Sequence, residues 1–222
     1  MIDHNFIIPK ENKKKKDVTD PLEKPLLYFI VGGTGSGKST LLANLLMTLE
    51  EKHDFTNALF VTSNNRDKLL EAVEMDITSS PSDLSEFMLK VRQAKGDEKS
   101  ILVLDDIQGS SKFNIMLGRS EFIEFVLSHR HFGSGCWILA TAQTLRNSYT
   151  PVFRNNVSLW FVYSPRSEPE KKAFLEISDP DKMKKAMGLL RIEGRHQFLY
   201  INKQNPDDIK YFLGFQRQLI DL

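Results

Sequence analysis

Residues 32–39 read Gly-Gly-Thr-Gly-Ser-Gly-Lys-Ser and fit the pattern G-x-x-x-x-G-K-[ST] at every fixed position. The apolar run at residues 26–31 predicts a buried strand before this loop, and residues 40–47 predict a helix after it. Glycines let the backbone wrap closely around phosphate oxygens with its N–H groups pointing inward, and the helix N-terminus adds a favourable dipole. A glycine-rich turn matching by chance would lack these flanking elements, so we expect a nucleoside triphosphate site.

Each residue type in this loop has an expected role. Lys38 is predicted to reach the β- and γ-phosphates, and the Ser39 hydroxyl to hold Mg²⁺. The residues expected to contact the nucleotide are Gly32, Gly33, Thr34, Gly35, Ser36, Gly37, Lys38, Ser39 and Thr40.

Composition bounds the class of protein. A chain of 222 residues with 41% hydrophobic and 27% charged residues is ordinary for one soluble globular domain. The single cysteine, Cys136, lies in an apolar run, which suits a reducing compartment and argues against a zinc cluster. No apolar stretch approaches the ~20 residues that cross a bilayer, and the N-terminus is polar. We therefore expect neither secretion nor a transmembrane segment.

The charge is distributed unevenly, although the net charge is only +1. Residues 1–24 are polar, carry lysines at 13–16 and are predicted to form an N-terminal arm, which leaves 25–222 as a single P-loop domain. A second basic group comprises Lys182, Lys184, Lys185, Arg191 and Arg195. Such runs either form a solvated surface or contact nucleic acid, and the sequence leaves both interpretations open.

Strand and helix patterns alternate along the rest of the chain. Apolar runs predict further strands at 58–62, 101–104, 137–141, 157–163 and 198–201. Helical spacing appears at 67–75, 84–93, 121–129 and 168–190, the last broken near Pro180, whereas 109–111 and the region of Pro151 and 155–156 are interpreted as loops. Nearly continuous apolar strands separated by helices predict an α/β fold: a P-loop NTPase with a mainly parallel sheet and helices on both faces.

Polar residues at the ends of two predicted strands complete the expected site. Asp105 and Asp106 follow the strand at 101–104, and Gln143 follows the strand at 137–141. Ligands of such sheets bind at the carboxyl ends of the strands. Asp105 is expected to support Mg²⁺, Asp106 to orient or deprotonate the attacking water, and Gln143 to sense the γ-phosphate. The alternative is a helix-capping or surface aspartate pair.

Two arginines are candidates for stabilising transition-state charge. Arg130 precedes the strand at 137–141, and Arg154 follows it. In ring ATPases a guanidinium from a neighbouring subunit neutralises this charge, and either residue could do so. The alternative for each is a surface ion pair.

Taken in order, these blocks resemble the genome-packaging ATPases of the FtsK–HerA superfamily, in particular the short poxvirus-type branch, over about residues 25–202. The discriminating features are the paired aspartates, Arg130 with its neighbouring histidines, Gln143, and the Arg-Asn-Asn run that starts at Arg154. The resemblance implies Asp106 as catalytic carboxylate, Gln143 as sensor and Arg130 as trans-acting arginine. In the cellular translocases the strand usually ends in Thr-Gln, whereas Ala142 intervenes here, so Arg154 remains an alternative to Arg130.

The resemblance further implies a RecA/FtsK-like ASCE core and an ATP-hydrolysing translocase that packages double-stranded DNA into a preformed viral capsid. ATP and Mg²⁺ would be its cofactors. Its partners would be DNA, identical subunits in a ring of five or six, and a capsid or portal-vertex protein. Its location would be the virion or the host cytoplasm and viral factory.

Other functions share the phosphate loop. A small-molecule P-loop kinase would need an acceptor pocket and an arginine-rich lid, and no lid pattern is evident. An NTP-dependent switch would recruit a partner without needing fast hydrolysis, although Asp106 and Gln143 favour water attack. A helicase or partition-type ATPase would share the chemistry and differ only in what moves.

Overall fold

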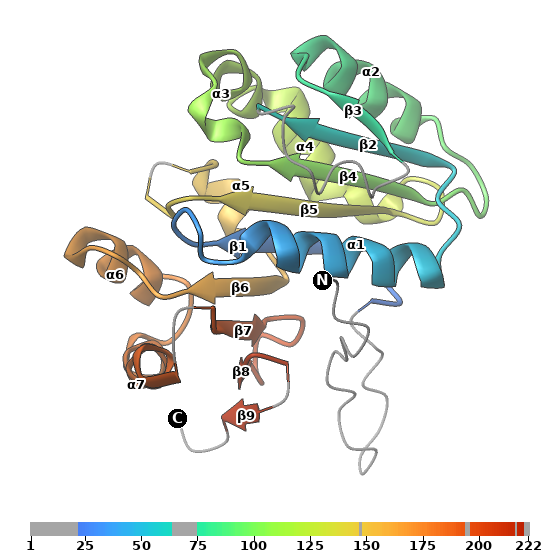
Figure 1. The fold of residues 1–222 in the computed structure, drawn as a ribbon. Coiled ribbons are helices and arrows are strands. Elements are labelled where there is room, and N and C mark those ends of the chain that lie inside the picture. Colours follow the sequence, from blue (N-terminus) through green and yellow to red (C-terminus); the bar gives the residue numbers. More distant parts are fainter. Residues whose placement is uncertain (1–21, 64–74, 147, 194–195, 216, 220–222) are drawn as a thin grey trace.

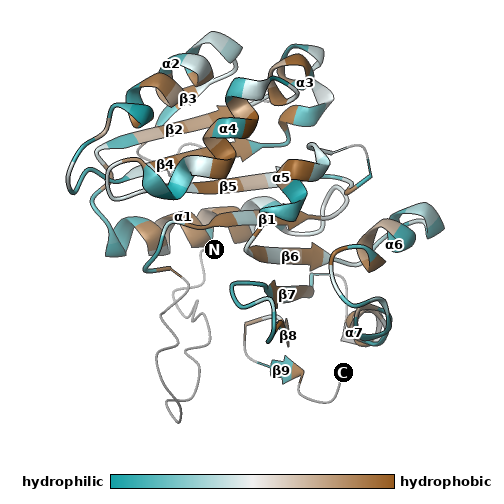
Figure 2. Cartoon of the chain, turned by 180° about the vertical axis from the view of Figure 1, so that it is seen from behind, coloured by the Kyte–Doolittle hydropathy of each residue, from teal (hydrophilic) through white to brown (hydrophobic). Residues whose placement is uncertain are grey.

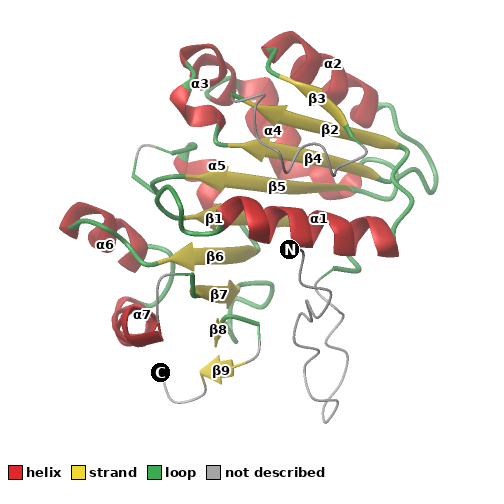
Figure 3. Ribbon diagram, viewed as in Figure 1, coloured by secondary structure: helices red, strands yellow, loops and turns green. Residues whose placement is uncertain are grey.

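The central feature of the fold is a nine-stranded sheet with strand order β3-β2-β4-β5-β1-β6-β7-β8-β9 (Figures 1 and 3). A computed structural model describes residues 22–63, 75–146, 148–193, 196–215 and 217–219. The strands are β1 (Leu27–Val31), β2 (Asn57–Thr62), β3 (Asp76–Thr78), β4 (Ser100–Asp105), β5 (Cys136–Ala142), β6 (Leu159–Tyr163), β7 (Phe198–Asn202), β8 (Lys210–Leu213) and β9 (Arg217–Leu219).

Helices cover both faces of the sheet. They are α1 (Lys38–Lys52), α2 (Pro81–Arg92), α3 (Ser111–Leu117), α4 (Ser120–Ser128), α5 (Pro151–Asn155), α6 (Glu168–Leu175) and α7 (Pro180–Glu193), with short 3-10 helices η2 (Ile107–Gly109) and η3 (His129–His131). The apolar face of α1 packs on one side of the sheet, and α2 to α7 contribute to the core on the other side (Figure 2). None of the helices in the described ranges is long and apolar enough to span a membrane.

The central strand β1 shows why the run at 26–31 is apolar throughout. All five of its residues are buried, and they alternate between the two cores. Phe29 faces the core of α2 to α7, whereas Tyr28 and Ile30 face α1. A strand buried on both faces needs apolar residues at every position rather than at every second one. The predicted α/β fold with a mainly parallel sheet is therefore confirmed.

The direction of the strands positions the site. The six strands from β3 to β6 in the sheet order pair in parallel, and only β7, β8 and β9 pair antiparallel. The carboxyl ends of β1, β4, β5 and β6 therefore meet at one edge of the sheet (Figure 1). The polar residues predicted at the ends of strands, together with the phosphate loop, lie at the carboxyl ends of β1, β4 and β5.

Some local predictions were wrong. The region interpreted as a loop at Pro151 is the helix α5, whose N-cap Thr150 accepts a hydrogen bond from the Phe153 amide. Proline fits both a turn and the first position of a helix, which is why the sequence was ambiguous here. The predicted loop at 109–111 is shorter, because α3 begins at Ser111. The short strands β3, β8 and β9 were not predicted, and most of the helix predicted at 67–75 lies outside the described residues.

His129 is a buried titratable group within this fold. It lies in η3 with 2% of its surface exposed, and its Nδ1 is 2.6 Å from the carbonyl oxygen of Cys136. The pKa of His129 is lowered to about 4, chiefly by burial and also by the charges of Arg130 and His131, whereas the hydrogen bond to the Cys136 carbonyl acts in the opposite direction. The imidazole is therefore neutral in the folded protein at neutral pH.

This burial predicts acid destabilisation. Between pH 6.5 and about 4 the unfolded chain binds a proton at His129 that the folded chain does not. The free energy of unfolding therefore decreases as the pH is lowered through this range. The loss attributable to this group is on the order of 3 kcal/mol. We expect His129→Asn to weaken the pH dependence of the midpoint of thermal unfolding between pH 7 and 4.5. The same substitution at the exposed His131 is the control, and equal slopes for both variants would contradict the prediction.

Candidate nucleotide site

The predicted phosphate loop connects β1 to α1. The Gly32 amide donates to the Ala142 carbonyl at 3.1 Å, which extends the pairing of β1 with β5 by one residue. Gly37 precedes α1 with φ of 105°, a left-handed conformation that a side chain would disfavour. The loop therefore turns sharply into the helix, whose first amides are available to an anion.

Lys38 lies across the loop that precedes it. Its Nζ donates to the Gly32 carbonyl at 2.6 Å and lies 3.4 Å from the Gly33 carbonyl. Partial burial lowers the pKa of Lys38, Asp106 and Asp105 oppose that shift, and Arg166 adds to it. A phosphate group brought next to this ammonium would compensate for the loss of hydration.

Thr141 holds both aspartates. Its hydroxyl donates to Asp105 Oδ1 at 2.7 Å and accepts from the Asp106 amide at 3.0 Å. Asp106 has φ of 48° and ψ of 36°, so it occupies the left-handed region, which Asp tolerates better than most residues. Its carbonyl oxygen accepts from the Ser63 hydroxyl at 3.0 Å. Residues from the ends of β2 and β5 thus fix the turn in which the second aspartate points away from its strand.

Gln143 connects the second aspartate to the phosphate loop. Its Nε2 donates to Asp106 Oδ2 at 2.5 Å, and its Oε1 accepts from the Thr34 hydroxyl at 3.4 Å. The intervening Ala142 is explained by strand geometry: residues two apart lie on the same face, so Thr141 and Gln143 both reach the aspartates. Asp106 and Gln143 also line a cleft of about 770 Å³.

The donor set fits magnesium. A serine hydroxyl at the start of α1, Ser39, and the carboxylate of Asp105 are hard oxygen ligands, and Mg²⁺ binds through few protein ligands together with phosphate oxygens and water. Within the described ranges, no group of three or more His, Cys, Asp or Glu could hold a metal ion. The residues present therefore match a cation that arrives with a nucleotide rather than one held by a protein cage.

The two candidate arginines lie at opposite ends of the parallel strands. Arg130 lies before β5 and donates to the Ser158 hydroxyl at 2.7 Å, at the amino end of the strands and away from its own phosphate loop. Arg154 lies in α5 and donates to the carbonyls of Leu145 and Ser148 at 3.1 and 3.3 Å. It therefore secures the loop that follows Gln143, a structural contact within its own chain.

Sequence reasoning missed a third arginine. Arg166 follows β6 and donates to the Thr34 carbonyl, next to the phosphate loop. Its neighbours Tyr163 and His196 also approach the loop, at 3.4 and 3.7 Å from where a Gly37 Cβ would lie. No motif marks these residues. The signal that could have found them is topological, since β6 pairs with β1 and its carboxyl end must lie beside the loop.

The basic segments are described only in part. In α7 the side chains of Lys182, Lys184 and Lys185 are exposed, whereas its apolar residues pack into the core. Arg195 and the lysines at 13–16 lie outside the described residues, and so does the side chain of Arg191.

A family model described as an AAA domain matches residues 22–149, from the segment before β1 to the loop after β5. The chain belongs to the AAA domain family. This match confirms the prediction of a P-loop ATPase. None of the curated proteins compared with the chain matches it.

Solved structures share the fold at low sequence identity. The genome-packaging NTPase B204 of Sulfolobus turreted icosahedral virus 2, solved with sulfate, has a TM-score of 0.61 and 15% identity, covering 84% of this chain and 95% of B204. The B204 DNA-packaging ATPase of Sulfolobus turreted icosahedral virus has a TM-score of 0.60 and 16% identity, over 85% and 97%. The pCW3 conjugation coupling protein TcpA, solved with ATPγS, has a TM-score of 0.60 and 17% identity, over 88% and 62%.

These similarities bear on the fold. The predicted resemblance to packaging ATPases is confirmed at this level, because the chain has the fold of B204 over nearly the whole length of that protein. Structures of B204 with ATPγS and AMPPCP are among those that match.

Proposed function

We propose that this chain is an ATP-hydrolysing translocase of double-stranded DNA, which packages a viral genome into a capsid as a ring of identical subunits. Its cofactors are ATP and Mg²⁺, and a capsid or portal-vertex protein is its docking partner. It acts in the virion or in the host cytoplasm and viral factory. The observation that carries the proposal is the 2.5 Å hydrogen bond from Gln143 to Asp106 beside the phosphate loop. Further support comes from the genome-packaging NTPase B204, because this chain shares its fold over 95% of the length of B204.

The chemistry follows from the residues around the loop. The amides of the loop and of α1 bind the phosphates, and Lys38 adds a positive charge beside the oxygens where charge develops. Mg²⁺, when bound through Ser39 and Asp105, supplies charge neutralisation across the phosphate oxygens. Asp106 accepts the proton of the attacking water. Gln143 orients the Asp106 carboxylate and the water. A carboxylate linked to an amide suits water attack better than transfer to a small acceptor.

Arg130 is the better candidate for action in trans. Its position at the amino end of the strands keeps it away from its own nucleotide, as a residue that serves a neighbouring site would be. To act in trans, Arg130 would have to break one hydrogen bond, to Ser158, whereas Arg154 would have to break two to the loop after β5. In a ring, hydrolysis in one subunit would then depend on the position of the next.

The exposed lysines of α7 supply a DNA contact in this proposal. Lysine side chains bind the phosphate backbone rather than base edges, so translocation would be independent of sequence and sensitive to salt. We expect linear double-stranded DNA to raise the rate of ATP hydrolysis at low salt, and the stimulation to decline as salt is raised from 50 to 200 mM. Phosphate release measured with and without DNA tests this.

The controls separate the alternatives. The Asp106→Asn variant, assayed alongside, corrects for contaminating ATPases. Hydrolysis that does not respond to DNA at any salt concentration would contradict the translocase. Tight ATP binding with no hydrolysis would favour a nucleotide-dependent switch, and phosphate transfer only in the presence of a small acceptor would favour a kinase.

A further inference from the structure

The guanidinium of Arg166 lies against the phosphate loop at Gly33. A Cβ placed on Gly33 would be 2.4 Å from Arg166 Nε, 2.6 Å from its Cζ and 2.9 Å from its Cδ, distances that real side chains do not reach. The phosphate-loop pattern leaves position 33 open to any residue. A side chain at this position would therefore push against the end of the flexible Arg166 side chain, which would have to move.

Arg166 has no acidic partner among the described residues. Its one hydrogen bond within that part of the chain goes to the Thr34 carbonyl, and the side chain is exposed. A guanidinium carries five N–H donors, so most of its donors remain available to a ligand. Its positive charge also repels that of Lys38 and thereby lowers the Lys38 pKa. Two cations beside one loop, without a carboxylate on the second, favour binding of an anion.

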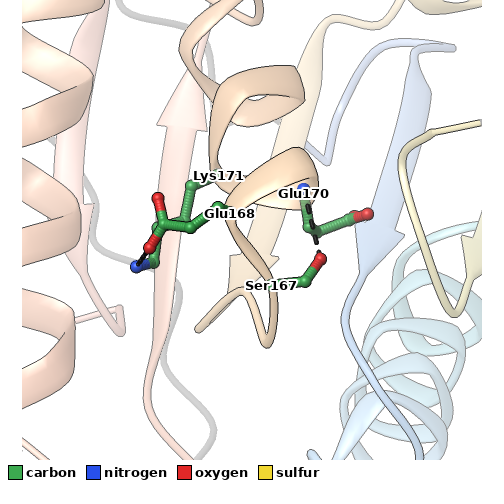
Figure 4. A network of polar contacts seen from close by, with 4 residues as sticks. All are labelled: Ser167, Glu168, Glu170 and Lys171. Atoms are coloured by element: carbon green, nitrogen blue, oxygen red, sulfur yellow. Dashed lines mark hydrogen bonds and ion pairs between the residues drawn. The ribbon is translucent and has the colours of Figure 1, made fainter.

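The segment that carries Arg166 is hydrogen-bonded to the loop that follows Gln143. The Ser167 hydroxyl caps α6 by accepting from the Glu170 amide, and the buried Glu170 carboxylate accepts from the Leu145 amide at 2.5 Å. Figure 4 shows Ser167 and Glu170 on one side of the helix start, and the Glu168–Lys171 ion pair on the other. The arginine is thus held at a fixed place relative to Gln143, two residues before Leu145.

Arg166 and Lys38 approach the same end of the phosphate loop, at residues 32–34. Lys38 Nζ contacts Gly32 and Gly33, and Gln143 contacts Thr34, so these groups converge on residues 32–34. Residues 32–34, Gln143 and Arg166 line a cavity of about 170 Å³, several times the roughly 30 Å³ that one water molecule occupies in the liquid. The amides nearer α1 cradle the α- and β-phosphates in such loops. The space beside Arg166, at the other end of the loop, is therefore where we expect the terminal phosphate.

We propose that Arg166 binds the terminal phosphate of ATP within its own subunit and lets the chain distinguish ATP from ADP. The inference rests on the ATPase assignment and not on DNA or ring formation. Arg166 would release the Thr34 carbonyl or share its donors with a phosphate oxygen, forming a charge-assisted hydrogen bond that ADP cannot make. Part of the charge neutralisation expected from a neighbouring subunit would then be present in the isolated chain.

The experiment compares the affinities of the isolated chain for AMPPNP and for ADP, both with Mg²⁺, by calorimetric titration. We expect Arg166→Ala to weaken AMPPNP binding about tenfold or more and ADP binding less than about twofold. Arg166→Lys should lie between, because lysine keeps the charge without the planar fork. Lys171→Ala removes a positive charge from the same helix start, away from Gly33, and should leave both affinities unchanged.

A second variant keeps the proposal testable if Arg166→Ala folds poorly. Gly33 lacks a left-handed φ, so Gly33→Ala is compatible with the backbone, but its methyl group would displace the guanidinium. This variant should lose the same preference for AMPPNP. A ratio of the two affinities that stays at the wild-type value in both variants would overturn the proposal, whether both nucleotides bind normally or both bind weakly.

Discussion

The Asp106→Asn variant is expected to hydrolyse ATP about 10²- to 10⁴-fold more slowly than the wild type while binding it with a Kd within about threefold. Asparagine cannot accept the proton of the attacking water, although its side-chain oxygen can still accept the hydrogen bond from Gln143. Steady-state phosphate release measures the first quantity, and titration with ATP measures the second.

The backbone makes this substitution well suited to the purpose. Asp106 has a left-handed conformation, with its amide bound to Thr141 and its carbonyl to Ser63, and asparagine adopts that conformation as readily as aspartate. The variant should therefore keep the turn, and thermal unfolding checks that it does. Loss of ATP binding together with hydrolysis would make Asp106 a structural residue, and unchanged hydrolysis would exclude it as the base.

The parts of the site that the sequence could predict share a local signature. The phosphate loop is continuous in the chain, and its strand and helix are marked by hydrophobic runs of the right length. Asp105 ends β4, Asp106 follows it, and Gln143 follows β5 directly, and parallel strands bring their carboxyl ends to one edge. The hydrogen bonds of Gln143 to Asp106 and Thr34 are therefore the kind of contact that strand order alone makes plausible.

The parts that could not be predicted depend on contacts between distant segments. Arg166 is 132 residues from its hydrogen-bond partner Thr34, and nothing in the run Ser-Pro-Arg-Ser distinguishes it from an ordinary loop. Its importance follows only once β6 is known to pair with β1. The same applies to Arg154, whose hydrogen bonds to Leu145 and Ser148 give it a structural contact that the sequence did not reveal. Helix α5 was missed for a different reason, because proline is common both in turns and at the first position of a helix.

The Lys38→Ala variant is expected to lose both hydrolysis and the stabilisation that ATP gives. We expect the hydrolysis rate to fall about 10²- to 10³-fold, because a preorganised donor to the phosphate oxygens is removed. In the wild type, ATP at 100 times its Kd should stabilise the fold by about 2.7 kcal/mol, or about 5–10 °C in the midpoint of thermal unfolding. In the variant this shift should nearly vanish.

The nucleotide-free protein provides the internal control. Alanine at position 38 removes the hydrogen bond to Gly32 but also a partly buried ammonium, whose pKa is lowered by that burial and by Arg166. These opposing effects should leave the midpoint without nucleotide within about 2 °C of the wild type. Lys90→Ala, at an exposed position of α2, should behave as the wild type with and without ATP. An ATP-induced shift of wild-type size in Lys38→Ala would place the nucleotide elsewhere, because the loop at 32–39 could not then be the site that binds the phosphates.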